Sequence, residues 1–217
     1  AHPSGGLPIK PARYQRSEGK NADDLAFRFS SVVDDWDLAG SLFYGTVRNP
    51  ILSVVDIGTA LEPYYPKQKS LGLEAQYTGD ATLLKWESLH GSQDNKNFFA
   101  AVAGLEYTLY GLLDQVWDLG LLVEAQHDER PQAAAKRIYV AGLRLTLNDA
   151  KDTNLLFLTS QDEDWDQSLI SFEASRRLNS WSSIDVGAKF FDAKTPTSAF
   201  GSLDDDDTIS IKLNMFF

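Results

Sequence analysis

The feature that most constrains this chain is a two-residue repeat of hydrophobicity. In the last ten residues, TISIKLNMFF, apolar side chains occupy every second position from Ile209 to Phe217, and polar side chains fill the gaps up to Asn214. Successive side chains of a β-strand point to opposite faces, so this segment would have one apolar and one polar face. A free C-terminus is usually polar and frayed. We therefore predict that residues 208–217 form a strand inserted in a larger sheet.

The same alternation recurs from Leu25 onward, in segments of about 9 to 13 residues separated by turn-like stretches. We predict strands at 25–34, 36–47, 70–78, 81–91, 98–110, 116–127, 137–148, 154–162, 168–178, 181–192 and 208–217. Tight connections are expected at 34–35, 79–80, 112–115, 149–152 and 179–180, and longer ones at 49–69, 91–97, 128–136, 163–167 and 193–207. No helical periodicity competes with this pattern, which predicts an all-β, antiparallel fold.

The two faces of these predicted strands differ in character. One face is apolar, for example at Leu119, Leu121 and Val123 in one strand and at Ala141 and Leu143 in another. The other face interleaves glycines with the ionisable side chains Glu74, Lys85, Glu87, Glu106, Asp118, Glu124, Arg144, Glu173, Arg177, Asp185, Lys189 and Lys212. Charges are not buried alone in a dry core, so these side chains are expected to pair across strands or to face water.

Two architectures produce such faces. A soluble barrel or sandwich turns the apolar face inward, whereas a transmembrane barrel turns it outward to lipid. The strand lengths match those needed to cross a bilayer, and longer loops are expected at one rim than at the other. Aromatic residues also gather at both ends of the strands, as Trp36, Tyr110 and Trp181 do near short turns and Tyr44 and Tyr139 near longer connections. We predict a transmembrane antiparallel β-barrel of about 11–12 strands over residues 24–217, preceded by an irregular loop or tail at 1–23. In this barrel, the ionisable side chains of the polar face would line the lumen.

Composition excludes several other classes of protein. The chain has no cysteine, which removes disulfides, thiolate metal sites and a cysteine nucleophile. A formal net charge of −11 argues against nucleic-acid binding, which depends on Lys and Arg. No apolar run has the length of a transmembrane helix. We expect no cofactor and no metal.

Four stretches are similar to a family of uncharacterised proteobacterial outer-membrane proteins. They are LPIKPARYQRSEGKNADDLAFRFS, DWDLAGSLFYGTVRNP, LEPYYPKQKSLGLEAQYTGDATLLKWESLH and VAGLRLTLNDAKDTNLL. The resemblance covers nearly the whole chain and implies a location in the outer membrane of a Gram-negative bacterium, with membrane lipid and lipopolysaccharide as neighbours. It carries no catalytic signature and no assigned activity.

The terminal strand also resembles the C-terminal assembly signal of such barrels, which their insertion machinery reads. The matching positions are Ile211, Leu213, Met215 and Phe217. Members of the family are longer at the N-terminus, which implies that this chain is the C-terminal portion of a larger barrel. The alternative is that residues 51–57 form one further strand, so that twelve strands close a complete small barrel.

These features support three hypotheses about function. The first is a porin-like barrel that acts as a passive or partner-coupled channel for small or amphipathic solutes, with a slight preference for cations because acidic side chains outnumber basic ones on the polar face. The second is a structural or anchoring barrel whose interior is closed by salt bridges. The third is a lipid-modifying enzyme that uses Ser88 or Ser92 with His90, although same-face neighbours on a strand lie too far apart for a direct hydrogen bond.

Two acidic segments, 162–166 and 204–207, have the carboxylates that Ca²⁺ prefers. Neither has the glycine-punctuated spacing of a dedicated calcium loop. They are interpreted as solvated loops, with a divalent bridge to lipopolysaccharide phosphates as the alternative.

Overall fold

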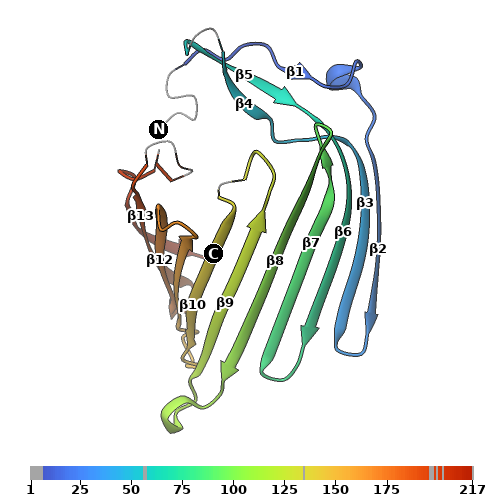
Figure 1. The fold of residues 1–217 in the computed structure, drawn as a ribbon. Coiled ribbons are helices and arrows are strands. Elements are labelled where there is room, and N and C mark those ends of the chain that lie inside the picture. Colours follow the sequence, from blue (N-terminus) through green and yellow to red (C-terminus); the bar gives the residue numbers. More distant parts are fainter. Residues whose placement is uncertain are drawn as a thin grey trace. The chain divides into compact units, whose positions relative to one another are not determined.

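A computed structural model describes residues 7–55, 58–133, 135–195, 198, 200, 201 and 203–216 (Figure 1). In this part of the chain, the regular structure is β, with two short 3-10 helices, η1 (Gly19–Asn21) and η2 (Leu112–Asp114). The strands are β1 (Arg13–Tyr14), β2 (Leu25–Val33), β3 (Trp36–Thr46), β4 (Ile51–Val55), β5 (Ala60–Tyr65), β6 (Lys67–Thr78), β7 (Thr82–Gln93), β8 (Lys96–Leu109), β9 (Asp118–Asp128), β10 (Arg137–Thr146), β11 (Asn154–Asp162), β12 (Gln167–Asn179), β13 (Ser182–Ala193) and β14 (Thr208–Met215).

The strands form two sheets. The small sheet has the order β1-β5-β4, and the large sheet runs from β14 through β13, β12, β11, β10, β9, β8, β7, β6 and β3 to β2. Neighbours in the large sheet follow one another in the chain except β3 and β6, between which β4 and β5 are inserted. Within the described residues, β2 and β14 end this order without pairing with each other, so the large sheet is not closed into a barrel.

The predicted strands are confirmed, each to within a few residues, and so is the all-β, antiparallel fold class. The alternative that residues 51–57 add a twelfth strand to the barrel sheet is wrong. Ile51–Val55 does form a strand, but it pairs with β5 in the small sheet. Residues 56 and 57 lie outside the described part of the chain.

The predicted alternation of short and long connections is only partly correct. Asp34 and Asp35 turn β2 into β3 as expected. However, β7 and β8 are joined by Asp94 and Asn95 alone, both at positive φ, where a longer loop was predicted. Asp and Asn tolerate this left-handed conformation, which suits two-residue hairpin turns. Conversely, the expected tight turn between β8 and β9 spans residues 110–117 and contains η2.

By its contacts the chain divides into two compact units, the first within Ala1–Gln76, Trp86–Val102 and His127–Lys136. This unit contains the small sheet, to which residues 8–15 add parallel hydrogen bonds, such as Lys10 N–H to the Leu61 carbonyl (2.8 Å). The buried apolar side chains of the described residues all lie in this unit, and they are Val47, Ala60, Leu61, Tyr64, Pro66, Phe98 and Ala100.

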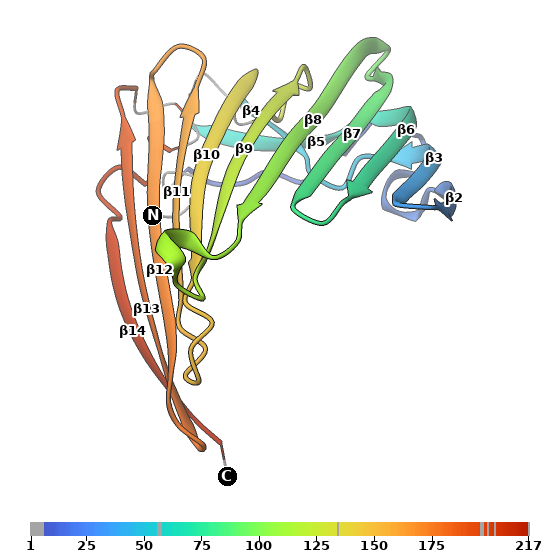
Figure 2. The same ribbon diagram turned by 90° about the horizontal axis from the view of Figure 1, so that it is seen from below.

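The second unit, within Tyr77–Lys85, Ala103–Gln126 and Arg137–Phe217, has the opposite burial pattern. Strands β11 to β14 lie side by side in it (Figure 2). Its buried described residues are glycine or polar, namely Gly120, Gly142, Thr153, Asp162, Gln167, Ser171 and Ser182. Large apolar side chains are instead exposed, for example Leu143 at 47% and Ile211 at 72%. No other described element of this unit covers its apolar face.

Candidate functional site

Strand register sorts the side chains of β10 to β14 into rows of one character. One row crosses the five strands as Leu143, Phe157, Phe172, Ala188 and Ile209, and the next apolar row as Leu145, Leu155, Ala174, Val186 and Ile211. The intervening row is Arg144, Leu156, Glu173, Gly187 and Ser210. We call the first side the apolar face and the second side the polar face. A one-residue slip would exchange the two faces, so this register is strongly specified.

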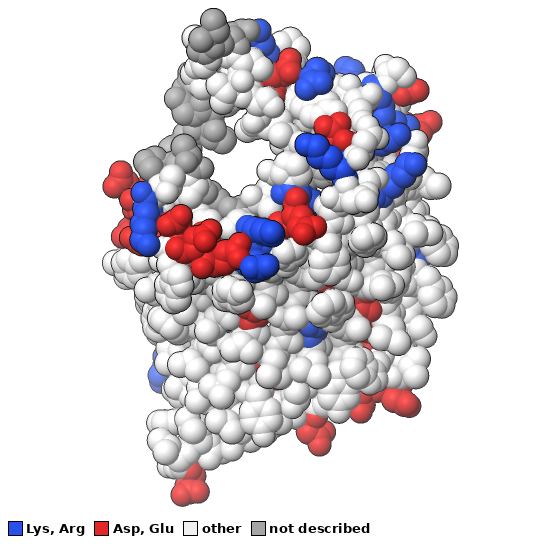
Figure 3. Space-filling model, viewed as in Figure 1, with Lys and Arg blue, Asp and Glu red and all other residues white. Residues whose placement is uncertain are grey.

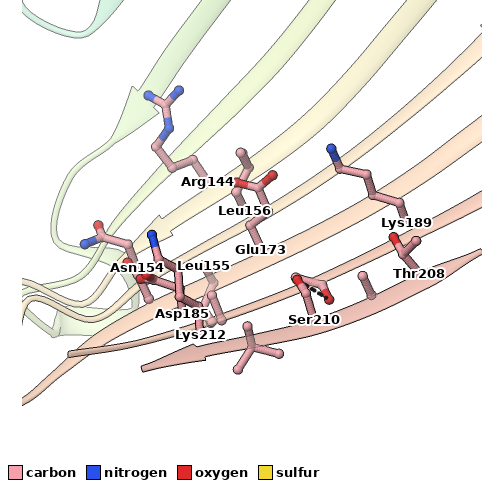
Figure 4. Close-up of a pocket in the computed structure, with 15 residues that line it drawn as sticks. Arg144, Asn154, Leu155, Leu156, Glu173, Asp185, Lys189, Thr208, Ser210 and Lys212 are labelled. Atoms are coloured by element: carbon pink, nitrogen blue, oxygen red, sulfur yellow. Dashed lines mark hydrogen bonds between the residues drawn. The ribbon is translucent and has the colours of Figure 1, made fainter. Parts of the chain in front are cut away.

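The polar face of β10 to β14 forms a hollow of about 590 Å³. Five of the predicted lumen-lining side chains border it, namely Arg144, Glu173, Asp185, Lys189 and Lys212 (Figure 4). Figure 4 shows Arg144, Glu173 and Lys189 standing on the same side of the sheet. Small or short polar residues such as Gly187 and Ser210 lie between them and leave space in front of the strands. We take this hollow as the candidate functional site.

The charges around this hollow are only partly compensated. Arg144 donates from Nη1 to Glu106 Oε1 at 2.6 Å. The Asp185 carboxylate accepts a hydrogen bond from Asn214 Nδ2 at 2.6 Å. Glu173, Lys189 and Lys212 form no ion pair with another described residue, although Lys212 lies directly opposite Asp185 in the β13–β14 register. The site therefore presents free charges of both signs.

The polar face of the first unit carries an ion pair in which both charges are compensated. Arg28 of β2 donates from Nη2 to Glu74 Oε2 at 2.6 Å and from Nε to Glu74 Oε1 at 3.4 Å. Glu74 was predicted on this face, whereas Arg28 was missed. The signal for it was present, because Arg28 alternates with Leu25, Phe27 and Phe29 in the segment LAFRFS.

The remaining predicted lumen residues are distributed along the strands and do not converge on the hollow. Asp118 accepts from Asn148 Nδ2 at 2.7 Å, and Arg177 pairs with Asp152 at 3.1 Å, both near the β10–β11 connection. Glu124 accepts from Gln126 Nε2 at 2.6 Å. Two further predicted residues, Lys85 and Glu87, lie two positions apart on β7.

The apolar face is exposed in the first unit as well. Phe27 is 63% exposed and Leu73 is 52% exposed. Figure 3 shows charged side chains gathered over the small sheet, whereas the strand surface in the same view is mostly white. Phe98, near the start of β8, is by contrast only 3% exposed, and the Arg130 guanidinium lies 5.8 Å from its ring centre.

The predicted assembly signal falls on the apolar face of β14. Ile211 lies opposite Val186 and Leu213 lies opposite Ile184 on β13, and their exposed fractions are 72% and 53%. Met215 lies at the end of the strand and is 51% exposed. Phe217 lies outside the described residues.

The Ser88, His90 and Ser92 candidates lie on the apolar face of β7. His90 and Ser92 border a second hollow, of about 550 Å³, in the first unit. No Asp or Glu borders this hollow among the described residues, so the carboxylate that would orient a catalytic histidine is missing there.

Carboxylates of the two acidic segments accept hydrogen bonds from backbone N–H groups of the same loops or of the strand end beside them. Asp204 accepts from the Ala193 backbone N–H at 2.8 Å, and Asp207 accepts from the Phe191 N–H at 2.9 Å. Asp162 accepts from the Asp166 N–H at 2.8 Å. No group of three or more His, Cys, Asp or Glu side chains in the described ranges is arranged to hold a metal ion.

Comparison with protein-family models finds no match to this chain. Comparisons with curated protein sequences and with solved structures find none either. In the part of the chain that the structure describes, no helix has the length and apolarity needed to cross a membrane.

Proposed function

We propose that this chain forms the wall of a β-barrel in the outer membrane of a Gram-negative bacterium, where it acts as a passive or partner-coupled conduit for small or amphipathic solutes. The observation that carries the proposal is the reversed burial of the second unit, where polar residues and glycines are buried and Leu143, Phe157 and Ile211 are exposed. Exposure of such side chains to water is unfavourable, whereas contact with lipid tails would remove their surface from water. The resemblance to proteobacterial outer-membrane proteins points to the same location.

A membrane location sets a requirement for the edges of the large sheet. Backbone groups left unpaired in hydrocarbon cost several kcal/mol each, so open sheet edges do not occur there. In the proposed barrel, β2 and β14 must therefore each pair with another strand. Strand β14, whose sequence resembles an assembly signal, is the strand that we expect the insertion machinery to engage.

The conduit is favoured over a closed barrel by the uncompensated charges at the hollow. Glu173, Lys189 and Lys212 have no ion pair among the described residues, and charges in that state need water in front of them. The structural barrel is the second candidate, because the pairs Arg28–Glu74 and Arg144–Glu106 are what a salt-bridged interior would contain.

Conductance in planar bilayers tests these two functions. We expect the full-length protein to form ohmic pores that prefer cations slightly, and Lys189→Glu/Lys212→Glu to strengthen that preference in a KCl gradient. The control is Lys96→Glu/Lys151→Glu, which reverses two charges away from the hollow and should leave the reversal potential nearly unchanged. A protein that inserts into the bilayer without conducting would favour the structural barrel.

A further inference from the structure

Three cationic side chains surround the ring of Tyr44 on the apolar face of the first unit. The Arg16 guanidinium lies 5.6 Å from the ring centre, and the Lys67 and Lys69 ammonium groups lie 5.7 Å and 5.8 Å from it. Each distance is within the range of a cation–π interaction. Tyr44 is near the end of β3, and the two lysines are alternate residues at the start of β6, so both project to the same face.

The three cations are compensated unequally. Arg16 lies 3.4 Å from Asp24, which also binds Arg48 at 2.7 Å. Lys67 and Lys69 form no ion pair with any other described residue. Two like charges beside one ring repel each other, and an anion bound between them would remove this repulsion.

An apolar hollow adjoins this pair of lysines. It is the hollow of about 550 Å³ that His90 borders, and Lys69 and Tyr44 border it too. Its apolar lining is exposed, with Leu25 at 71%, Phe27 at 63%, Leu42 at 56% and Leu71 at 45%. Positive charge and an open apolar surface therefore meet at one place, which is the chemistry that a phosphorylated amphiphile requires.

We propose that Lys67, Lys69 and the adjoining hollow bind a phosphorylated, acylated glycolipid of the lipid A type, with the phosphate at the lysines and an acyl chain against Phe27 and Leu42. This inference rests on the proposed membrane location, in which the longer connections, including the segment between β3 and β6, lie at the outer leaflet. A free phosphate would gain nothing from the apolar lining, whereas each methylene of an acyl chain buried there contributes to affinity.

Binding can be measured by native mass spectrometry of the full-length protein in detergent. The probes are bisphosphorylated lipid A, the same lipid without phosphates, and glucosamine 1-phosphate as a headgroup without acyl chains. We expect the bisphosphorylated lipid to bind, and Lys67→Ala/Lys69→Ala to weaken this binding roughly twenty- to thirty-fold. The control Lys96→Ala/Lys151→Ala removes two lysines that do not border the hollow, and it should bind as the unmodified protein does.

Three results would overturn the inference. They are equal binding by the lysine variant and its control, equal binding of lipid A with and without phosphate, and competition by glucosamine 1-phosphate as strong as that by the lipid. Insertion of the protein into phosphatidylcholine vesicles is measured in a separate experiment, as the test of the membrane location. A protein that inserts but does not select lipid A overturns this inference alone, whereas failure to insert overturns the proposed membrane function.

Discussion

Two adjacent apolar residues of β11 provide the sharpest test of which face meets lipid. Phe157 is the fourth residue of this nine-residue strand, and its cross-strand neighbours on the apolar face are Leu143 and Phe172. Leu156 precedes it on the polar face, between Arg144 and Glu173. Hydrophobicity alone does not distinguish the two positions. The substitutions Phe157→Arg and Leu156→Arg therefore place the same charge at nearly the same depth on opposite faces.

The expected costs follow from exposure and charge. Phe157 is 38% exposed, so about 75 Å² of its surface would face lipid, and losing that contact costs about 2 kcal/mol. A guanidinium near the bilayer midplane adds roughly 2–4 kcal/mol, which brings Phe157→Arg to roughly 4–6 kcal/mol. The guanidinium of Leu156→Arg would face water opposite Glu173, and we expect a cost below about 1.5 kcal/mol.

The measurement is equilibrium unfolding by guanidinium chloride of the full-length protein in phosphatidylcholine vesicles, followed by tryptophan fluorescence. Phe157→Ala removes the lipid contact without adding a charge and should cost about 2 kcal/mol. The reasoning is refuted if both arginine variants lose similar stability, or if Leu156→Arg loses more. The second result would mean that the polar face is the buried one.

Three further predictions concern single positions. Gly91→Ala should destabilise the protein by about 1–3 kcal/mol, because a Cβ there would collide with the Lys69 carbonyl, whereas Gly104→Ala, which meets nothing closer than 3.7 Å, should be neutral or slightly stabilising. Burial and, to a smaller extent, a hydrogen bond to Asp94 raise the pKa of Tyr64 to about 12. Difference absorbance between the wild type and Tyr64→Phe should therefore show a phenol that ionises near pH 12. The stability that this group contributes should be complete below about pH 10 and decline above it. A hydrogen bond from the Thr153 backbone N–H lowers the pKa of Asp149, so stability from this group is present at neutral pH and is lost as the pH falls below about 4. Asp149→Asn should therefore lose less stability on acidification than the wild type. An unchanged loss of stability at acid pH in this variant would contradict the prediction.

The strands and their faces could be predicted from the sequence because both are local properties. Alternation such as Ile209, Ile211 and Leu213 reports which side chains share a face, and the pairing of β13 with β14 keeps Val186 opposite Ile211. A two-residue period needs no knowledge of distant contacts. This is why the positions of the strands are confirmed across the large sheet.

The pairing of β1 with β5 in the small sheet could not be predicted because it is not local. The two-residue β1 carries no periodicity, and Arg13 and Tyr14 pair in parallel with Tyr64 and Tyr65. Strand β5 also contains Pro63, which reads as a strand breaker. The ion pair between Arg28 of β2 and Glu74 of β6 reaches across β3, which lies between these two strands, and sequence spacing does not give this strand order.

The polar face also indicates what its charges are for. The Arg144–Glu106 pair is partly exposed, with 47% and 20% of the two side chains accessible, and pairs of this kind contribute about 0–1 kcal/mol. It therefore adds little to the stability of the wall, which lipid contact with the apolar face would stabilise far more. Because such charges contribute little to folding, their main effect would be on solutes that approach the polar face. The free Glu173, Lys189 and Lys212 would set the electrostatic potential that a solute meets at the hollow, and this is why reversing the two lysines should change ion selectivity far more than stability.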